Sequence, residues 1–211
     1  LNCAALPDTL IESELFGAAA GAHSQARRAI AGKVAVAEGG TLFLDEIAEL
    51  AIPAQAKLLQ LLQSKQYFCL GGTMPIQADV RLIAATNTNL EEAVRERRFR
   101  EDLFYRLQVL PIRMPSLDER REDIAELSLH FAATACRRHG LPRIEISRGA
   151  LRAIEAAEWP GNLRQLAHAV EAATIRAAGE AAAQIEARHV FPDAPASAET
   201  DDRPVSFQEA T

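Results

Sequence analysis

Two short apolar runs, each followed at once by polar residues, constrain the fold of this chain most strongly. Thr41–Leu44 (TLFL) follows a Gly-Gly pair and leads into Asp45 and Glu46, and the run VRLIAA leads into Thr86 and Asn87. Short apolar runs bounded in this way are typical of strands buried in a parallel sheet, with polar groups released at their carboxyl ends. The sequence therefore predicts two buried parallel strands.

Helical patterns alternate with these strands. Apolar residues recur at helical spacing from Asp8 to Phe16, and the pattern ends at Gly17. Pro53 opens a leucine-rich helix, and a further helix is predicted from Leu90 to Arg97. LGGTMPIQ reads as a loop and VLPIRMP as one more short strand. Strands that alternate with helices indicate an α/β fold with a parallel sheet and flanking helices.

The pattern changes after Pro115. Three helices are predicted there, Arg120–His139, a helix capped by Ser147 that runs to Glu158, and Leu163–Ala178. We therefore expect an α/β core over 1–117, a small all-helical subdomain over 118–193, and a Pro/Ala/acidic linker over 194–211.

The overall composition fits an ordinary globular protein. Hydrophobic residues make up 48% and charged residues 25% of the 211 residues, and no apolar run approaches a membrane span. No signal-peptide pattern is present, so a cytoplasmic location without a membrane partner is expected. The net charge of −6 argues against strong nucleic-acid binding by these residues. Three widely spaced cysteines predict neither a disulfide framework nor a zinc site.

The polar strand ends are the first candidate site. Asp45 and Glu46 suit a Walker B element, in which one acid holds nucleotide-bound magnesium and the other polarises the attacking water. Thr86 and Asn87 follow the neighbouring strand, at the edge where open α/β sheets bind ligands. The alternatives are solvated carboxylates at a strand end and a plain Thr-Asn turn.

A cluster of arginines forms the second candidate: Arg95, Arg97, Arg98, Arg100 and Arg106. Arg100 and Arg106 lie within FREDLFYRL, where apolar neighbours would fix the guanidinium positions. A fixed, permanently charged donor suits the transition state of γ-phosphate transfer. A solvated surface and a nucleic-acid patch are the alternatives for the cluster.

Seven segments, taken in order, carry a family resemblance: NCAALPDTLIESELFG, GGTLFLDEI, AQAKLLQLLQ, VRLIAATN, FREDLFYRL, ERREDI and WPGNLRQL. Together they resemble the central AAA+ ATPase domain of bacterial enhancer-binding proteins, the activators of sigma-54 RNA polymerase. The resemblance covers about residues 1 to 193. It implies an AAA+ P-loop NTPase-type sheet followed by a helical lid, with ATP and Mg²⁺ as cofactors.

The resemblance also implies roles for individual residues. Asp45 and Glu46 correspond to Walker B, with Asp45 on the metal, and Asn2 corresponds to the asparagine that restrains the catalytic glutamate. Thr86 and Asn87 correspond to sensor I, Arg100 and Arg106 to arginine fingers acting on the neighbouring subunit, and Arg164 to sensor II beside the nucleotide. Fingers that act in trans imply a homo-oligomeric ring, typically a hexamer or heptamer.

Two departures from the family pattern affect the expected function. No GxxxxGK phosphate loop occurs in the 211 residues. The family has it just upstream of the position of Asn2, so we interpret the chain as a piece cut at both ends that binds ATP poorly alone. The family's DNA-binding helix-turn-helix domain is likewise expected beyond residue 211.

The second departure is GAHSQA, which stands where the family's sigma-54-contacting loop reads GAFTGA. Its residues are Gly21, Ala22, His23, Ser24, Gln25 and Ala26. His23 replaces Phe, which makes an apolar contact partly polar and sensitive to pH. Gln25 replaces Gly, which removes backbone freedom. Lone His23 could in principle ligate a metal, but no partner ligand is visible in the sequence.

Three functions remain open from the sequence. The first is an ATP-hydrolysing activator that remodels sigma-54 RNA polymerase through a variant loop. The second is a nucleotide-gated, DNA-bound oligomer that does not engage sigma-54 because of that loop. The third is an AAA+ protein of another class, such as a clamp or helicase loader, against which the inserted GAHSQA loop argues.

Overall fold

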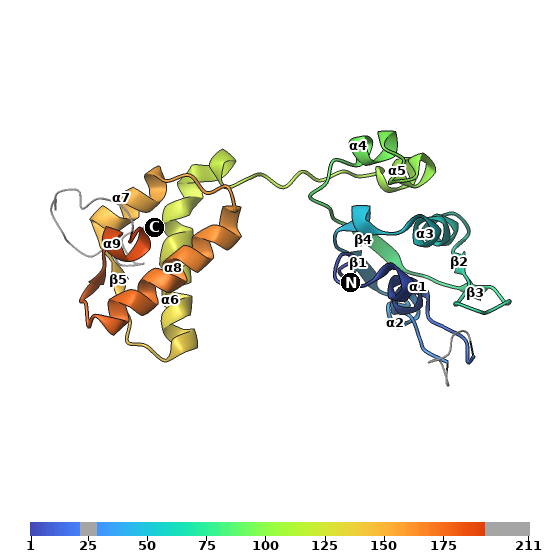
Figure 1. The fold of residues 1–211 in the computed structure, drawn as a ribbon, viewed down its shortest axis with the longest axis horizontal. Coiled ribbons are helices and arrows are strands. Elements are labelled where there is room, and N and C mark those ends of the chain that lie inside the picture. The colour runs from blue at the N-terminus through green and yellow to red at the C-terminus, as the bar shows by residue number, and fades with distance from the viewer. Residues whose placement is uncertain (22–28, 193–211) are drawn as a thin grey trace. The chain divides into compact units, whose positions relative to one another are not determined.

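The computed structural model describes residues 1–21 and 29–192. The chain divides into two compact units, Leu1–Ile112 and Arg113–Thr211, each with its own hydrophobic core (Figure 1).

The sheet of the first unit contains the two predicted strands. β1 (Thr41–Leu44) pairs in parallel with β4 (Arg81–Ala84), so that Leu44 lies opposite Ala84. Leu42 and Leu44 are buried, whereas Phe43 is 46% exposed. β4 is largely exposed as well. The prediction of parallel strands is confirmed, but the prediction that both are buried is wrong, because alternate side chains point to a face on which Phe43 is exposed.

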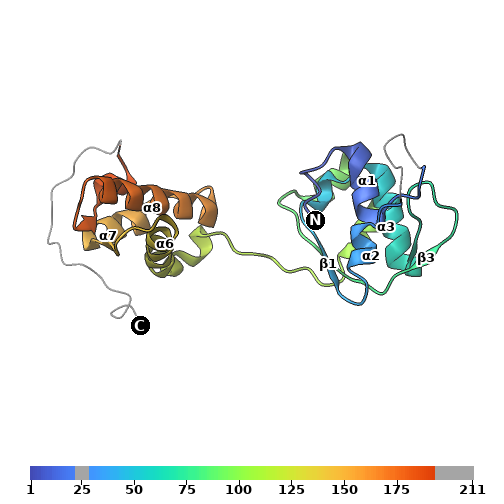
Figure 2. The same cartoon turned by 90° about the horizontal axis from the view of Figure 1, so that it is seen from below.

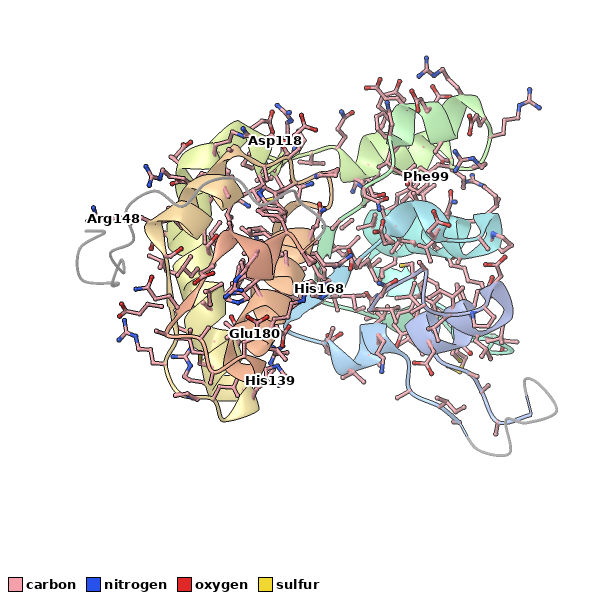
Figure 3. The ribbon with its side chains drawn as sticks, turned by 60° about the vertical axis from the view of Figure 1, so that its left-hand side comes forward. Phe99, Asp118, His139, Arg148, His168 and Glu180 are labelled. Carbon is pink, nitrogen blue, oxygen red and sulfur yellow. The ribbon has the colours of Figure 1, made fainter. Side chains whose placement is uncertain are left out.

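The first unit contains further elements besides this sheet. They are α1 (Asp8–Phe16), α2 (Lys33–Val36), the 3₁₀ turn η1 (Ile47–Glu49), α3 (Ile52–Ser64), β2 (Gln66–Tyr67), β3 (Ile76–Gln77), α4 (Leu90–Arg95) and α5 (Glu101–Leu107). α1 and α3 lie next to each other (Figure 2), where Lys57 Nζ of α3 binds Glu12 Oε2 of α1 at 2.6 Å. Phe99, between α4 and α5, is buried in the core (Figure 3).

Several local predictions for this unit are confirmed and others need correction. The helices starting at Asp8 and near Pro53 form as predicted. The helix starting at Leu90 ends at Arg95, two residues early, because Arg97 has a φ of 59°. The predicted loop LGGTMPIQ includes β3, which pairs antiparallel with β2.

VLPIRMP is not a strand. It contains no regular secondary structure, and Val109, Leu110 and Ile112 are 80%, 77% and 78% exposed. Pro111 and Pro115 remove backbone donors from this segment, and no strand among the described residues pairs with it. The prediction of a strand here is wrong, because a strand also needs a hydrogen-bonding neighbour.

The second unit is helical apart from one short strand pair. Its elements are η2 (Asp118–Asp123), α6 (Ile124–His139), β5 (Glu145–Ile146), α7 (Arg148–Ala156), α8 (Asn162–Gly179), β6 (Gln184–Ile185) and α9 (Ala187–Val190). β5 and β6 pair in parallel, which the all-helical prediction missed. The first predicted helix begins at Ile124 and not at Arg120, because Arg120 has non-helical angles (φ −141°, ψ 53°).

Hydrogen bonds between side chains and the backbone fix the turns of the second unit. The Ser147 hydroxyl accepts a hydrogen bond from the Ala150 amide at 3.2 Å, as predicted for a helix cap. Buried Trp159 donates its indole N–H to the carbonyl of Ile154 at 2.9 Å. Asn162 Oδ1 accepts from the Leu117 amide at 2.6 Å, so the WPGN turn is tied to the start of the unit.

A pair of glycines brings two backbone segments of the first unit unusually close. Gly17 has a φ of 81°, and a Cβ added at Gly32 would lie 2.2 Å from the Gly17 nitrogen and 2.4 Å from the carbonyl carbon of Phe16. These neighbours are backbone atoms and cannot rotate away. Ala18 and Ile30 exchange two backbone hydrogen bonds beside this contact, at 3.0 and 2.8 Å.

Replacing Gly32 with alanine is therefore expected to destabilise the first unit. Forcing one methyl group into a closed contact costs about 1–3 kcal/mol, measurable by urea unfolding followed by circular dichroism. Gly149→Ala is the matched control, because a Cβ there meets nothing closer than Ser147 Oγ at 3.9 Å. An unchanged unfolding midpoint for Gly32→Ala would show that this contact is not rigid.

Candidate functional site

The carboxyl ends of β1 and β4 bring four of the predicted site residues together. The amide of Ala85 donates to the carbonyl of Leu44 at 2.8 Å, and the amide of Ile47 donates to the carbonyl of Ala85 at 3.0 Å. These bonds continue the strand pairing past its end, so that Asp45 and Glu46 lie beside Thr86 and Asn87. We call these four residues, together with Asn2, the strand-end cluster.

Asn2 joins the cluster from the other side of β1. It forms a parallel bridge with Asp45, in which the Asp45 amide donates to the carbonyl of Leu1 at 2.8 Å and the Cys3 amide donates to the carbonyl of Asp45 at 2.9 Å. Asn2 Oδ1 accepts from the amide of Ala4 at 2.9 Å. Asn2, Asp45 and Asn87 therefore come from three adjacent extended segments.

Glu46 adopts a backbone conformation that is uncommon for its residue type. Its φ and ψ are 54° and 51°, in the left-handed region, where a residue other than glycine costs roughly 1–2 kcal/mol. Its Oε2 accepts a hydrogen bond from the Asn87 amide at 3.3 Å. Strained residues held by their surroundings are concentrated at functional sites. Glu46 is thus directed towards the end of the neighbouring strand.

The carboxylate of Asp45 is available for a ligand. The side chain is half-buried, and within residues 1–21 and 29–192 no hydrogen bond or ion pair engages its oxygens. Thr86 and Asn87 are engaged locally, since Thr86 Oγ1 accepts from the Thr88 amide at 3.0 Å and Asn87 Oδ1 accepts from the Thr88 hydroxyl at 3.3 Å.

Buried Cys3 borders this cluster. Burial raises the pKa of the Cys3 thiol to about 11, and the nearby Asp45 and Glu46 carboxylates add to the rise. Because the pKa is 9.0 when the thiol is unperturbed, this thiol contributes stability below pH 9.0 that is lost as the pH rises towards about 11.

We expect Cys3 to resist alkylation in the folded protein. The thiolate is the reactive form, and a raised pKa leaves little of it, so Cys3 should react at least about tenfold more slowly than half-exposed Cys69 near pH 8. Mass spectrometry after timed iodoacetamide treatment measures both rates, and urea-unfolded protein provides the control in which the rates converge. Equal native rates would contradict the burial of Cys3.

The two candidate arginines lie at the two ends of α5. Arg100 occupies the N-cap position without a side-chain capping bond, and its guanidinium donates two hydrogen bonds to Asp102, Nε to Oδ1 at 3.0 Å and Nη2 to Oδ2 at 2.7 Å. This contact raises the pKa of Arg100 and lowers the pKa of Asp102. Exposed Arg106 donates to the carbonyl of Leu62 at 3.2 Å. Within the described residues, neither arginine bonds to the strand-end cluster.

Two further predicted sites lie outside this cluster. Arg164 is exposed in the first turn of α8, in the second unit. Of GAHSQA, only Gly21 is described, with a φ of 81°, and 22–26 fall outside the described residues. The segment before the loop is held by Leu70, whose amide donates to the carbonyl of Gly17 and whose carbonyl accepts from the amide of Ala19, and the segment after it is held by the two bonds between Ile30 and Ala18.

Sequence reasoning missed Gln55, a fully buried polar residue of α3. Its side chain makes three hydrogen bonds to backbone atoms, one of them to the amide of Arg100. The available signal was its spacing, because Gln55 shares the apolar face of the helix with Leu58, Leu59 and Leu62.

Two models of known protein families match this chain. Residues 1–113 match the model described as the sigma-54 interaction domain. The chain belongs to that family. Residues 118–206 of this sigma-54 interaction domain protein match a second model, the AAA+ ATPase lid domain. The resemblance inferred from the seven sequence segments is thereby confirmed.

Similar proteins include two bacterial regulators. A Nif-specific regulatory protein from Enterobacter agglomerans is 49% identical over 174 residues, which cover 82% of this chain and 33% of that protein. The DNA-binding transcriptional regulator NtrC from Klebsiella pneumoniae is 46% identical over 180 residues, covering 85% and 38%. The chain thus spans little more than a third of these relatives.

Solved structures confirm the predicted fold class. NtrX from Brucella abortus in complex with ADP superposes with a TM-score of 0.82 and 33% identity, covering 100% of this chain and 48% of NtrX. The ATP complex gives the same TM-score and identity. RuvB from Thermotoga maritima, 17% identical with a TM-score of 0.53, shares the fold. No described helix of the sigma-54 interaction domain protein is long and apolar enough to cross a membrane.

Proposed function

We propose that these residues form the ATP-hydrolysing part of a cytoplasmic transcriptional regulator that acts on sigma-54 RNA polymerase. One observation supports this most directly: Glu46 is held in a left-handed conformation with its carboxylate on the Asn87 amide, at the shared ends of two parallel strands. Ligands of open α/β sheets bind at such ends. The NtrX complexes with ADP and ATP support nucleotide binding by this fold.

Glu46 and Asn87 would carry out the chemistry on the water molecule. Glu46 polarises the attacking water, which requires an ionised carboxylate, and the Asn87 side chain orients the water and the γ-phosphate. Asn2, on the opposite side of Asp45, holds Glu46 back until nucleotide is correctly bound. Thr86 anchors the turn that presents Asn87, since its hydroxyl binds the Thr88 amide.

The residues present fit a magnesium–ATP ligand. Mg²⁺ binds through one or two carboxylates and keeps most of its waters, and the Asp45 carboxylate at the strand end, which no described residue engages, would supply such a ligand. Bound Mg²⁺ would neutralise charge on the phosphates. A GxxxxGK phosphate loop is not among these 211 residues, so the proposal concerns the full-length protein. A full-length sequence without that lysine would contradict it.

Arg100 and Arg106 would act on the nucleotide of a neighbouring subunit. Both are permanently charged, Arg100 directly before α5 and Arg106 within it, and among the described residues neither bonds to its own strand-end cluster. Donors placed away from their own cluster fit a homo-oligomeric ring, hexameric or heptameric, in which each site lies between two subunits. Arg164 on the lid would contact the nucleotide bound by its own subunit.

The GAHSQA loop would carry the movement to the partner. The segment before the loop is bonded to Leu70, and Ile30 after the loop is bonded to Ala18, so both loop ends are connected to the body that contains the cluster. The partner is sigma-54 in the favoured function. In the alternative function, the altered loop leaves a nucleotide-gated oligomer, bound to DNA through another domain, that does not engage sigma-54.

Capture of sigma-54 by the full-length protein distinguishes these two functions. We expect the protein to co-elute with sigma-54 in size-exclusion chromatography when ADP with aluminium fluoride is present, and not with ADP alone. Intact ATP hydrolysis without capture would reject the sigma-54 partner but leave the ATPase standing. The double substitution His23→Phe and Ser24→Thr should then restore capture if the loop is the cause.

A further inference from the structure

We propose that Gln55 is a positioning residue that fixes Arg100 for its action on the neighbouring subunit and ties it to the turn after Glu46. The inference rests on the proposed function, because it assumes that Arg100 completes a nucleotide site in trans. It assigns a role to a fully buried residue of α3.

The amide of Gln55 is completely buried and completely used. Nε2 donates to the carbonyl of Leu50 at 2.6 Å and to the carbonyl of Arg98 at 2.9 Å, while Oε1 accepts from the amide of Arg100 at 2.8 Å. A buried polar group that loses a partner pays a large desolvation cost, so a fully bonded amide holds its partners in one arrangement.

These partners belong to the two segments that the proposed mechanism requires. Leu50 ends the η1 turn, which starts directly after Glu46. Arg98 and Arg100 flank Phe99, which is 2% exposed and anchors the entry to α5 in the core (Figure 3). One side chain therefore connects the turn after the catalytic glutamate with the segment that presents Arg100.

The rest of α5 is held against α3, the helix that contains Gln55. Leu103 is fully buried in the core of the first unit, and Arg106 Nη2 donates to the carbonyl of Leu62, at the far end of α3. Without Gln55, this segment would keep Phe99 in the core and the bonds from the amides of Arg98 and Phe99 to the carbonyl of Ala93, but no described residue would accept from the Arg100 amide. A misplacement of about 1 Å in a group that stabilises the transition state can cost on the order of 100-fold in rate.

The first test is kinetic and uses the full-length protein. Gln55→Met keeps the side-chain length but removes all three hydrogen bonds, and Gln63→Met, at an exposed position of the same helix, is the matched control. We expect Gln55→Met to lower ATP turnover roughly tenfold to 100-fold, with unchanged affinity for a fluorescent ATP analogue. The control should behave as wild type. Weakened analogue binding or unchanged turnover would overturn the proposal.

Mixed rings distinguish an effect on Arg100 from damage to the subunit's own site. Glu46→Gln subunits retain a normal Arg100, whereas Arg100→Ala subunits retain a normal Glu46. If Gln55 acts through Arg100, Gln55→Met subunits should regain activity when mixed with Glu46→Gln subunits and should gain none from Arg100→Ala subunits. The opposite pattern, or no recovery with either partner, overturns the proposal.

Two further measurements separate the possible failures. Gln55→Leu removes the same three hydrogen bonds without introducing a charge, and it should give the same pattern even if Gln55→Met folds poorly. The pair Glu46→Gln with Arg100→Ala contains no change at Gln55, so its failure to complement would overturn the proposed function itself. Complementation of that pair, without the predicted Gln55 pattern, would reject only the role of Gln55.

Discussion

Arg100→Ala in the full-length protein is expected to lower ATP turnover by roughly 10³–10⁵-fold, the range measured for removal of an arginine finger. The loss arises because the guanidinium stabilises charge that develops on the γ-phosphate in the transition state. Nucleotide affinity should change little, because this interaction forms mainly as the reaction proceeds. Steady-state phosphate release and fluorescent nucleotide binding measure the two quantities separately.

The control for Arg100 is another exposed arginine of the same cluster. Arg95 lies on α4, 71% exposed, with its guanidinium 3.8 Å from Glu92. Arg95→Ala should therefore leave turnover within about twofold, as expected for a weak surface ion pair. If Arg95→Ala and Arg100→Ala reduced turnover equally, the cluster would act through its overall charge, and the assignment of Arg100 would be wrong.

Glu46→Gln is expected to lower turnover about 10²–10⁴-fold, the usual contribution of a general base. The substitution removes the charge that polarises water, but the amide oxygen can still accept the Asn87 N–H. The turn after β1 should therefore be preserved. ATP should bind with near-normal affinity, and the unfolding midpoint in urea should stay unchanged.

Glu49→Gln provides the matched control for this second prediction. Glu49 is exposed and lies three residues further on, in the η1 turn, so its substitution should have no effect on turnover. Substantial turnover in Glu46→Gln, together with a large loss in Glu49→Gln, would transfer the role of base to Glu49.

Four residues of the strand-end cluster could be predicted because the pattern that marks them is local in the sequence. An apolar run places a strand, and the residues that follow lie at the sheet edge, so Asp45, Glu46, Thr86 and Asn87 could be placed together before the structure was known. The left-handed conformation of Glu46 had no sequence signal, because it is imposed by contacts on both sides of the turn.

Features that depend on distant partners were less predictable. VLPIRMP has the pattern of a strand but lacks a pairing partner in the described chain, and β5 pairs with β6 although each has only two residues. The contact between Gly17 and Gly32 and the hydrogen bonds of Gln55 join residues far apart in sequence. Nothing in the sequence indicates which residues these glycines and Gln55 contact.

Mixed-ring ATP hydrolysis measures whether Glu46 of one subunit and Arg100 of its neighbour form one hydrolytic site. Full-length Glu46→Gln and Arg100→Ala proteins, each inactive alone, are mixed in equal amounts under conditions that allow subunit exchange. About one quarter of the interfaces should then combine an intact Glu46 with an intact Arg100, and turnover should recover to that order. If the mixture stays as inactive as its components, the two residues do not meet across an interface, and the account is wrong.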